Sequence, residues 1–282
     1  PTAKSCIFIF LFGGPSQMDL FDPKPKLNEM HGQPLPESFT KNVRFAFLDK
    51  ATATIMGSPR KFQRHGQSGL EFSDLLPNLA TCADDIAMIR SVHTESFNHA
   101  PGEIQMSTGV PIFGRPSIGS WMTYGLGSPS RDLPGYVVLT AGGRPPQAAT
   151  SNWASGFLPP SYQGVFFHNQ GEPVLNLKNP AGVSAAVQRS QLDAVSDLNR
   201  GRYQRVPDPE IAARIAAYEL AFRMQSAAPE LIDLRRESPA TRRAYGLERT
   251  ESAEELKHSR RCGGAGVKHA FATNCLLARR LV

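Results

Sequence analysis

"FLFGGPSQMDLFD", residues 10–22, decides the fold predicted from this sequence, because it joins an apolar run to a glycine pair and two carboxylates. Residues 6–12 (CIFIFLF) show no alternation of apolar and polar side chains. Continuous apolarity of this kind, rich in β-branched and aromatic residues, is typical of a strand covered on both faces in a parallel sheet. We therefore expect a buried strand that ends in a glycine turn, with Cys6 as a small core residue within it.

Further apolar segments extend this pattern along the first half of the chain. Strands are predicted over residues 86–92 and 135–141, and helices over residues 75–85, 103–107 and 117–124. Alternation of strands and helices at these separations is typical of βαβ units. The sequence therefore predicts an α/β fold, with a mostly parallel sheet flanked by helices, in a single domain over residues 1–282.

The second half of the chain is predicted to be loop first and then helix. Residues 142–183 are rich in Pro and Gly and indicate a long loop or lid insertion, with short strands near 165–167 and 174–177. Asp208, Pro209 and Glu210 are typical of a helix start. Four apolar residues then follow at helical spacing and predict a buried face of a helix ending near residue 229: Ile211, Ile215, Tyr218 and Phe222.

The last part of the chain gives weaker patterns. Residues 235–269 are charged and contain several glycines, which indicates a variable surface connection. Residues 274–282 read as a helix that is cut short, so we expect the chain to be truncated on its C-terminal side.

Composition excludes several classes of protein. The chain has 282 residues, 40% of them hydrophobic, and a formal net charge of +6, which suits a folded protein with a core. The basic excess falls within residues 200–282, but acidic residues alternate with basic ones there and aromatics are not interleaved, so no nucleic-acid partner is expected. No apolar run reaches 18 residues, so no transmembrane segment is expected. The four cysteines lack the spacing of a metal finger.

Acidic side chains follow the first predicted strand at its carboxyl end, where open parallel sheets bind ligands. Asp19 and Asp22 could supply oxygen ligands to a hard cation at this edge. Asp22 precedes Pro23, which favours a turn residue over a ligand. Asp19 is the preferred metal ligand, with capping of the turn as its alternative role.

The second predicted strand leads into "HTESFNH", residues 93–99, a cluster dense in groups that bind metals or protons. His99 follows Asn98 and is expected to open the helix that ends at Gly109. The start of a helix favours an anion, because its free amides and dipole attract negative charge. His99 could bind a metal as neutral imidazole or an anionic ester as imidazolium, and a purely structural role is the alternative.

Six blocks carry a resemblance to a known family: "LFGGPSQMDLFDPKP", "GQSGLEFSDLLPNLA", "SFNHAPGEIQMSTG", "GRPSIGSWMTYGLGS", "WASGFLPPSYQGV" and "DPEIAARIAAYELAFRMQ". Together they resemble the exported bacterial family called domain of unknown function 1501, which is placed in the alkaline phosphatase and sulfatase superfamily. The resemblance runs from residue 6 to about residue 245 and resumes over residues 271–282. It implies an alkaline-phosphatase-like fold that is incomplete at the C-terminal side, and a periplasmic or otherwise exported protein.

The resemblance also implies roles for individual residues. In the superfamily the first strand ends at a metal-binding Asp, and here Gly13-Gly14 stands at that point, with Asp19 the nearest carboxylate. The superfamily's nucleophile opens the helix that ends in Thr-Gly, which Thr108 and Gly109 match. Counting back places Asn98 or His99 at the nucleophile position, and neither carries a hydroxyl. Thr108 itself is expected to pack at the end of the helix.

The function implied is that of a metal-dependent hydrolase of sulfate or phosphate esters, small molecules or polysaccharides, with a divalent cation as cofactor. Asn98 and His99 are the expected catalytic residues, and Asp19 and His99 the expected metal ligands. The substrate-binding residues expected are Arg115 and Arg144 as anion clamps and Trp153.

Two alternatives stay open. The first is a non-catalytic anion- or carbohydrate-binding protein on the same scaffold, in which Trp121, Trp153 and Tyr162 stack on sugar rings or, more plainly, pack in the core. The second is a fragment without a function of its own.

Overall fold

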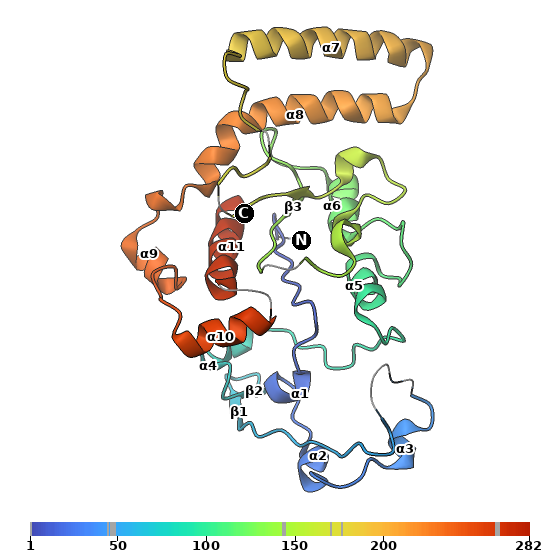
Figure 1. Cartoon of the computed structure of the whole chain (residues 1–282), viewed down its shortest axis with the longest axis vertical. Coiled ribbons are helices and arrows are strands. Elements are labelled where there is room, and N and C mark those ends of the chain that lie inside the picture. The colour runs from blue at the N-terminus through green and yellow to red at the C-terminus, as the bar shows by residue number, and fades with distance from the viewer. Residues whose placement is uncertain are drawn as a thin grey trace. The chain divides into compact units, whose positions relative to one another are not determined.

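The structure, a computed structural model, describes residues 2–43, 45, 49–142, 145–169, 171–175, 177–262 and 266–282 (Figure 1). The chain divides into two compact units, one of residues 10–102 and the other of residues 1–9 with 103–282. Each unit is described by itself below.

The unit of residues 10–102 contains short elements around a β-hairpin. In chain order they are α1 (Gln17–Leu20), α2 (Pro25–Glu29), α3 (Glu37–Thr40), β1 (Phe62–His65), β2 (Leu70–Ser73), α4 (Pro77–Ala80) and the 3₁₀ turn η1 (Ala83–Asp85). The strands β1 and β2 pair antiparallel, with Phe62 opposite Ser73 and His65 opposite Leu70. Phe72, which is 1% exposed, packs with Ala80 and Ala83 in the core of this unit.

The larger unit holds the long helices and a small parallel sheet. Helix α5 (His99–Thr108) begins before the division and enters this unit. The remaining elements are α6 (Ile118–Leu126), β3 (Val137–Val138), η2 (Ala149–Trp153), η3 (Pro160–Tyr162), β4 (Val165–Phe166), α7 (Ala185–Arg205), α8 (Pro209–Ile232), η4 (Leu234–Arg236), α9 (Pro239–Ala244), α10 (Ala253–Cys262) and α11 (Val267–Leu281).

The core of the larger unit forms where the parallel pair β3–β4 packs against α8. The Val165 amide donates to the Tyr136 carbonyl at 2.9 Å, and the Phe167 amide donates to the Val138 carbonyl at 2.9 Å. Phe167, 1% exposed, joins three other buried apolar residues there: Leu177, Met224 and Ala228. Removing these side chains from water is the main source of stability at this junction.

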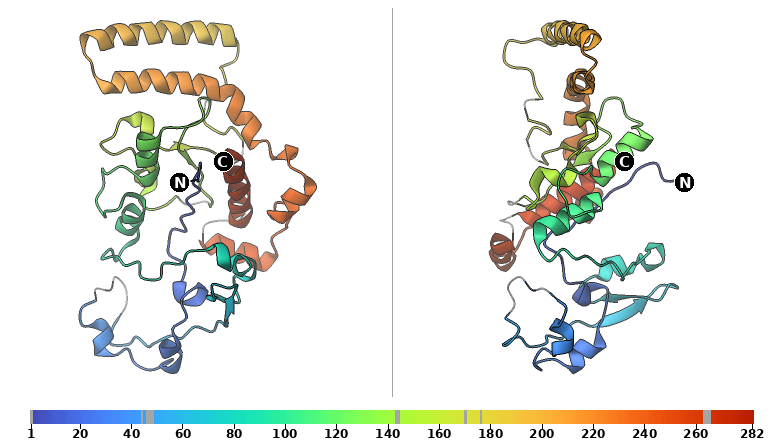
Figure 2. Two further views of the ribbon diagram at one scale, coloured as in Figure 1. Left: turned by 180° about the vertical axis from the view of Figure 1, so that it is seen from behind. Right: turned by 90° about the vertical axis from the view of Figure 1, so that its right-hand side faces the viewer.

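Helices α7 and α8 form an antiparallel hairpin, which Figures 1 and 2 show from three directions. Arg189 of α7 donates two hydrogen bonds to the Glu219 carboxylate of α8, at 3.1 and 2.7 Å. The predicted start of α8 is confirmed, because the Asp208 carboxylate accepts a hydrogen bond from the Glu210 amide. The helix continues through Pro229 to Ile232, and Tyr218 of the predicted buried face is 44% exposed.

The prediction of a buried strand over residues 6–12 is wrong. The structure describes these residues and forms no strand from them, and Ile9 and Leu11 are 59% and 53% exposed. An apolar run signals burial only if other strands supply its hydrogen bonds, and here none of the described strands pairs with it. Cys6 is therefore exposed and does not lie in a core. The glycine turn itself is confirmed, with positive φ at Gly13 and Gly14.

Two further strand predictions are corrected. Residues 86–92 are not a strand, and Ile89 and Val92 are 73% and 69% exposed. Of residues 135–141 only Val137 and Val138 form a strand, and of the short strands near 165–167 and 174–177 only the first forms, at least in the residues described. The mixed helix-and-sheet class is confirmed, but the described sheets have two strands each, and no large alkaline-phosphatase-like parallel sheet is seen in them.

The helix predictions agree with the structure more closely than the strand predictions do. Helix α5 contains residues 103–107, opens at His99 and ends before Gly109, as predicted. Helix α6 continues two residues beyond the predicted end, to Leu126 with Gly127 after it. Residues 235–269 contain α9 and α10 rather than loop alone, and the helix predicted over residues 274–282 begins earlier, at Val267.

A buried carboxylate joins α5 to the loop at residues 147–152. Glu103 is 3% exposed, and its oxygens accept hydrogen bonds from the backbone amides of Gln147 at 3.2 Å and Ala148 at 2.9 Å. The side chain of Asn152 donates to the same carboxylate at 3.3 Å and accepts from the Ser107 hydroxyl at 3.2 Å. A buried carboxylate needs such donors, because an unpaired one is costly to desolvate.

We predict that Glu103→Gln lowers the free energy of unfolding by about 2 kcal/mol, because an amide presents one acceptor oxygen where three donors converge. Urea unfolding followed by tryptophan fluorescence measures this change, since both Trp121 and Trp153 belong to the same unit. The matched control is Glu254→Gln, on the exposed surface of α10, with a change within about 0.5 kcal/mol. Equal effects of the two substitutions would contradict the role given to Glu103.

Candidate functional site

The start of helix α6 is anchored to the chain that follows η2. The Ser117 amide donates to the Ala154 carbonyl at 3.0 Å, and the Ser120 hydroxyl donates to the same carbonyl at 3.1 Å. The two serine hydroxyls lie 2.9 Å apart, and both residues are 0% exposed. Because Ala154 follows the loop that Glu103 holds, these bonds fix the orientation of α6.

A glycine brings residues 155–157 close to the segment before α6. Gly156 has φ +57°, and a Cβ placed on it would lie 2.4 Å from both the Arg115 carbonyl carbon and the Pro116 nitrogen. Any other residue at this position would force the two backbones apart. The close approach places Phe157, the next residue, beside the exposed face of α6.

Three exposed aromatic rings and the half-buried Tyr162 gather at this point, and we call them, with Arg115, the aromatic surface: Trp121, Tyr124, Phe157 and Tyr162. The Trp121 ring meets Phe157 edge-on at 5.7 Å and Tyr124 at 6.1 Å, and Tyr124 meets Tyr162 at 5.2 Å. Trp121, Tyr124 and Phe157 are 44%, 53% and 61% exposed, respectively. The Arg115 guanidinium lies over the Phe157 ring, 5.9 Å from its centroid.

This arrangement suits a ligand with apolar faces and negative charge. Large exposed aromatic side chains in a contiguous group mark interaction sites more often than scattered ones do. Their rings offer flat apolar area with little side-chain entropy to lose on binding. An arginine beside them can bind sulfate or phosphate through two parallel hydrogen bonds.

The residues expected to bind substrate or stack on sugar rings do not all lie at one place in the structure. Arg115, Trp121 and Tyr162 come together in the aromatic surface. Trp153 is half-buried and stacks on Phe166 of β4 at 6.3 Å, so it packs within the unit rather than in that group. Arg144 lies outside the described residues.

Asp19, the expected metal ligand, lies in α1 and contacts a serine 39 positions away. The Ser58 hydroxyl donates a short hydrogen bond to its carboxylate. Hydrogen bonds from Ser58 and Ser16 lower the pKa of Asp19 below its ordinary value, with a smaller contribution from the charge of Arg60. Asp19 is therefore held as an ionised carboxylate in a partly exposed setting, which suits either a ligand or a turn-stabilising role.

Asn98 and His99, the expected catalytic residues, are both exposed at the start of α5. The His99 amide donates to the Asn98 side-chain oxygen at 2.8 Å, so this side chain satisfies a free amide of the first helical turn. In the part of the chain that the structure describes, no hydrogen bond or ion pair joins Asp19 to either residue. Thr108 packs at the helix end as expected, donating to the carbonyls of Ile104 and Val110.

Among the described residues, no group of three or more His, Cys, Asp or Glu side chains that could hold a metal ion is present. Asp19 and His99 therefore belong to no such group among the described residues, and the divalent cation implied by the resemblance stays a prediction.

Sequence reasoning missed three residues that matter here. Tyr124 follows Trp121 by three positions, so helical spacing alone places both on one face of α6. Phe157 and Ser58 gave no signal in the sequence, because their contacts depend on loop paths between distant segments.

We predict that Ser58→Ala raises the pKa of Asp19 toward its ordinary value, because the largest stabiliser of its ionised form is removed. The folded pKa of Asp19 is lowered, so its contribution to stability is present above about pH 4 and is lost as the pH falls through that folded value. Titration of the carboxyl carbons by NMR measures the shift. Asp84 is the internal control, since backbone bonds from Ser68 and Gln67 lower its pKa; equal movement of both carboxyls would contradict the assignment.

In the part of the chain that the structure describes, none of the helices is both long and apolar enough to cross a lipid bilayer.

Comparisons with known proteins give one result. No curated protein and no solved structure matched the chain. The family described as "Protein of unknown function (DUF1501)" matches residues 3–282. Because this match covers almost every residue, the chain belongs to the domain of unknown function 1501 family.

Proposed function

We propose that this protein binds carbohydrate that carries sulfate or phosphate groups, at the aromatic surface on α6. The observation that carries the proposal is the contiguous group of exposed rings with Arg115 beside it. A sugar ring would stack on Trp121 or Tyr124, and the ester group would bind the Arg115 guanidinium. The half-buried Tyr162 meets the Tyr124 ring edge-on and adds apolar area beside it.

The anchoring of α6 supports this proposal physically. A binding surface loses less entropy when its side chains are already fixed before the ligand arrives. Ser117 and Ser120 hold the helix to the Ala154 carbonyl, and Gly156 holds Phe157 close to α6. Trp121 and Tyr124 therefore lie on an anchored helix, and Phe157 lies on a segment whose backbone is packed closely against residues 115 and 116.

We predict that Trp121→Ala weakens binding of a sulfated oligosaccharide about tenfold, through the loss of a stacking face. Isothermal titration calorimetry gives the affinity. Tyr203→Ala removes another exposed ring, 39% exposed and far along the sequence on α7, and is the matched control. Arg115→Gln is expected to weaken binding of the sulfated form and to leave its desulfated counterpart unchanged. Unaltered binding in both Trp121→Ala and Arg115→Gln would refute the proposal.

A second candidate function is the metal-dependent hydrolysis of sulfate or phosphate esters, in an alkaline-phosphatase-like sheet of which the parallel pair β3–β4 would be a part. The observation that favours it is the ionised carboxylate of Asp19, whose lowered pKa would suit a divalent cation. The family resemblance supports this second candidate. The same resemblance supports a further proposal, that the protein is exported from the cytoplasm. In this second proposal Asp19 and His99 are the metal ligands, and Asn98 with His99 contacts the ester.

We predict for this second candidate that p-nitrophenyl sulfate or phosphate is hydrolysed only with added Mn²⁺ or Ca²⁺. His99→Ala should lower the rate about a hundredfold or more, in the range typical of a lost acid–base group. Asp19→Asn should weaken the dependence on the added metal, because an amide replaces a charged oxygen ligand. Asp84→Asn is the matched control, since Asp84 is another carboxylate with a lowered pKa. Sugar binding without any metal-dependent turnover would leave the first proposal standing and reject the second.

A further inference from the structure

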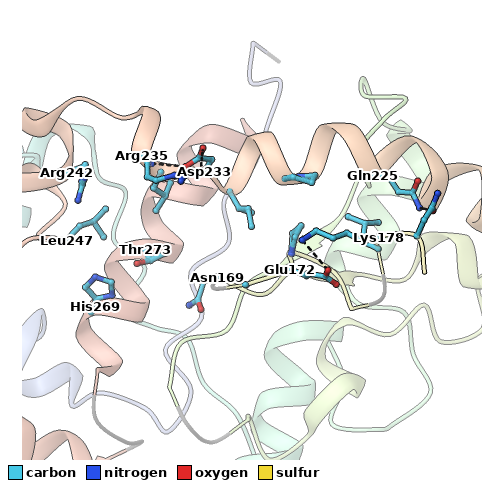
Figure 3. Close-up of a pocket in the computed structure, with 17 residues that line it drawn as sticks. Asn169, Glu172, Lys178, Gln225, Asp233, Arg235, Arg242, Leu247, His269 and Thr273 are labelled. Carbon is cyan, nitrogen blue, oxygen red and sulfur yellow. Dashed lines mark hydrogen bonds and ion pairs between the residues drawn. The ribbon is translucent and has the colours of Figure 1, made fainter. Parts of the chain in front are cut away.

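A cavity of about 800 Å³ lies within the larger unit, apart from the residues of the aromatic surface. Its walls come from the C-terminal half of α8, from η4, α9 and α11, and from residues 169, 171–173 and 177–179 (Figure 3). This volume is in the range of pockets that hold small organic ligands, roughly 300–1,000 Å³. Its lining combines apolar side chains with a few charged and amide groups, as such pockets do.

Two of the basic side chains in the lining are already neutralised by acidic partners. Lys178 lies 3.5 Å from the Glu172 carboxylate. Arg235 binds Asp233 through two hydrogen bonds, at 2.7 and 2.9 Å, and this contact lowers the pKa of Asp233 to about 2. Both pairs are drawn as dashed lines in Figure 3. Neither Lys178 nor Arg235 is therefore the first choice for binding an added anion.

Arg242 is different, because its acidic partner lies outside the cavity lining. Its Nε is 3.7 Å from the Glu248 carboxylate, beyond hydrogen-bond distance, and Glu248 is not among the residues that line the cavity. Figure 3 shows Arg242 at one end of the cavity together with Leu247, Thr273 and His269. That end thus collects a guanidinium, an imidazole and a hydroxyl.

The rest of the cavity offers groups suited to sugar hydroxyls and to the apolar faces of a ring. Asn169 lies near the middle of the view and Gln225 at the far end. The Asn169 amide donates to the Asn274 side chain at 2.9 Å, and the Gln225 amide donates to Asn179 at 2.9 Å, so both are held in place. Leu177 and Ile232 add apolar surface to the lining.

The walls of the cavity are also fixed. Arg280 of α11 donates to the backbone carbonyls of Asp233 at 3.0 Å and Glu230 at 3.1 Å, and its side chain is 17% exposed. These bonds satisfy carbonyls at the C-terminal end of α8, which a helix cannot satisfy by itself. Helices α8 and α11 are thereby joined at the side of the cavity that carries η4.

We propose that this cavity binds a small sugar ester, with its sulfate or phosphate group at Arg242 and His269 and its hydroxyl groups toward Asn169 and Gln225. This second binding site stands on its own residues and does not depend on the aromatic surface. Phosphate and sulfate esters share the tetrahedral oxyanion that the guanidinium recognises.

Calorimetric titration of the whole chain with glucose 6-phosphate, glucose 6-sulfate, glucose and inorganic phosphate tests the proposal. At least one of the two esters should bind, with glucose and inorganic phosphate each at least tenfold weaker than that ester. Arg242→Gln should weaken ester binding at least tenfold, and Arg242→Lys should do so by less. Arg200→Gln, on α7 with a side chain 64% exposed, is the matched control and should bind the esters as the unmodified protein does.

Thermal unfolding of each variant checks that the fold is kept, and Trp121→Ala separates this site from the aromatic surface. Ester binding that survives Trp121→Ala but not Arg242→Gln supports the cavity. The proposal is overturned if neither ester binds, if glucose or inorganic phosphate binds as tightly as the esters, or if Arg242→Gln and Arg200→Gln behave alike.

Discussion

The burial of one carboxylate constrains the path of the chain in the larger unit. Glu103, enclosed beside α5, draws in the amides of Gln147 and Ala148 and the side chain of Asn152. A buried carboxylate needs such donors, so the burial of Glu103 requires the residues that bond to it to lie against α5. The residues that follow this loop make the next contacts. The Ala154 carbonyl accepts hydrogen bonds from Ser117 and Ser120 at the start of α6, and the Trp153 carbonyl accepts one from the Gly164 amide just before β4.

This constraint links the fold to the proposed function. Because α6 is fixed through Ala154, the rings of Trp121 and Tyr124 stand on a rigid support while remaining exposed. Different hydrogen bonds stabilise the cavity near Arg242: Arg280 of α11 donates to backbone carbonyls at the end of α8. The two proposed sites share a preference for anionic sugar chemistry, but they are built independently. Loss of one should therefore leave the other intact.

The sequence predicted local structure better than long-range pairing. The cap at Asp208, the start of α5 at His99 and the turn at Gly13-Gly14 depend on neighbouring residues, and the structure has them. Strand formation over residues 6–12 depends on partners elsewhere in the chain, which apolar composition cannot specify. For the same reason Trp121 and Tyr162 could be named as sugar-stacking residues, whereas Phe157 and Glu103, which act through contacts across distant segments, could not.

Hydrogen exchange at the Gln147 and Ala148 amides tests the central claim most directly. If Glu103 holds this loop in solution, both amides exchange slowly, together with the Ser117 amide that donates to Ala154. The Gly171 amide, in an exposed part of another loop, supplies the fast reference within the same unit. Exchange of Gln147 and Ala148 as fast as that of Gly171 would contradict the account.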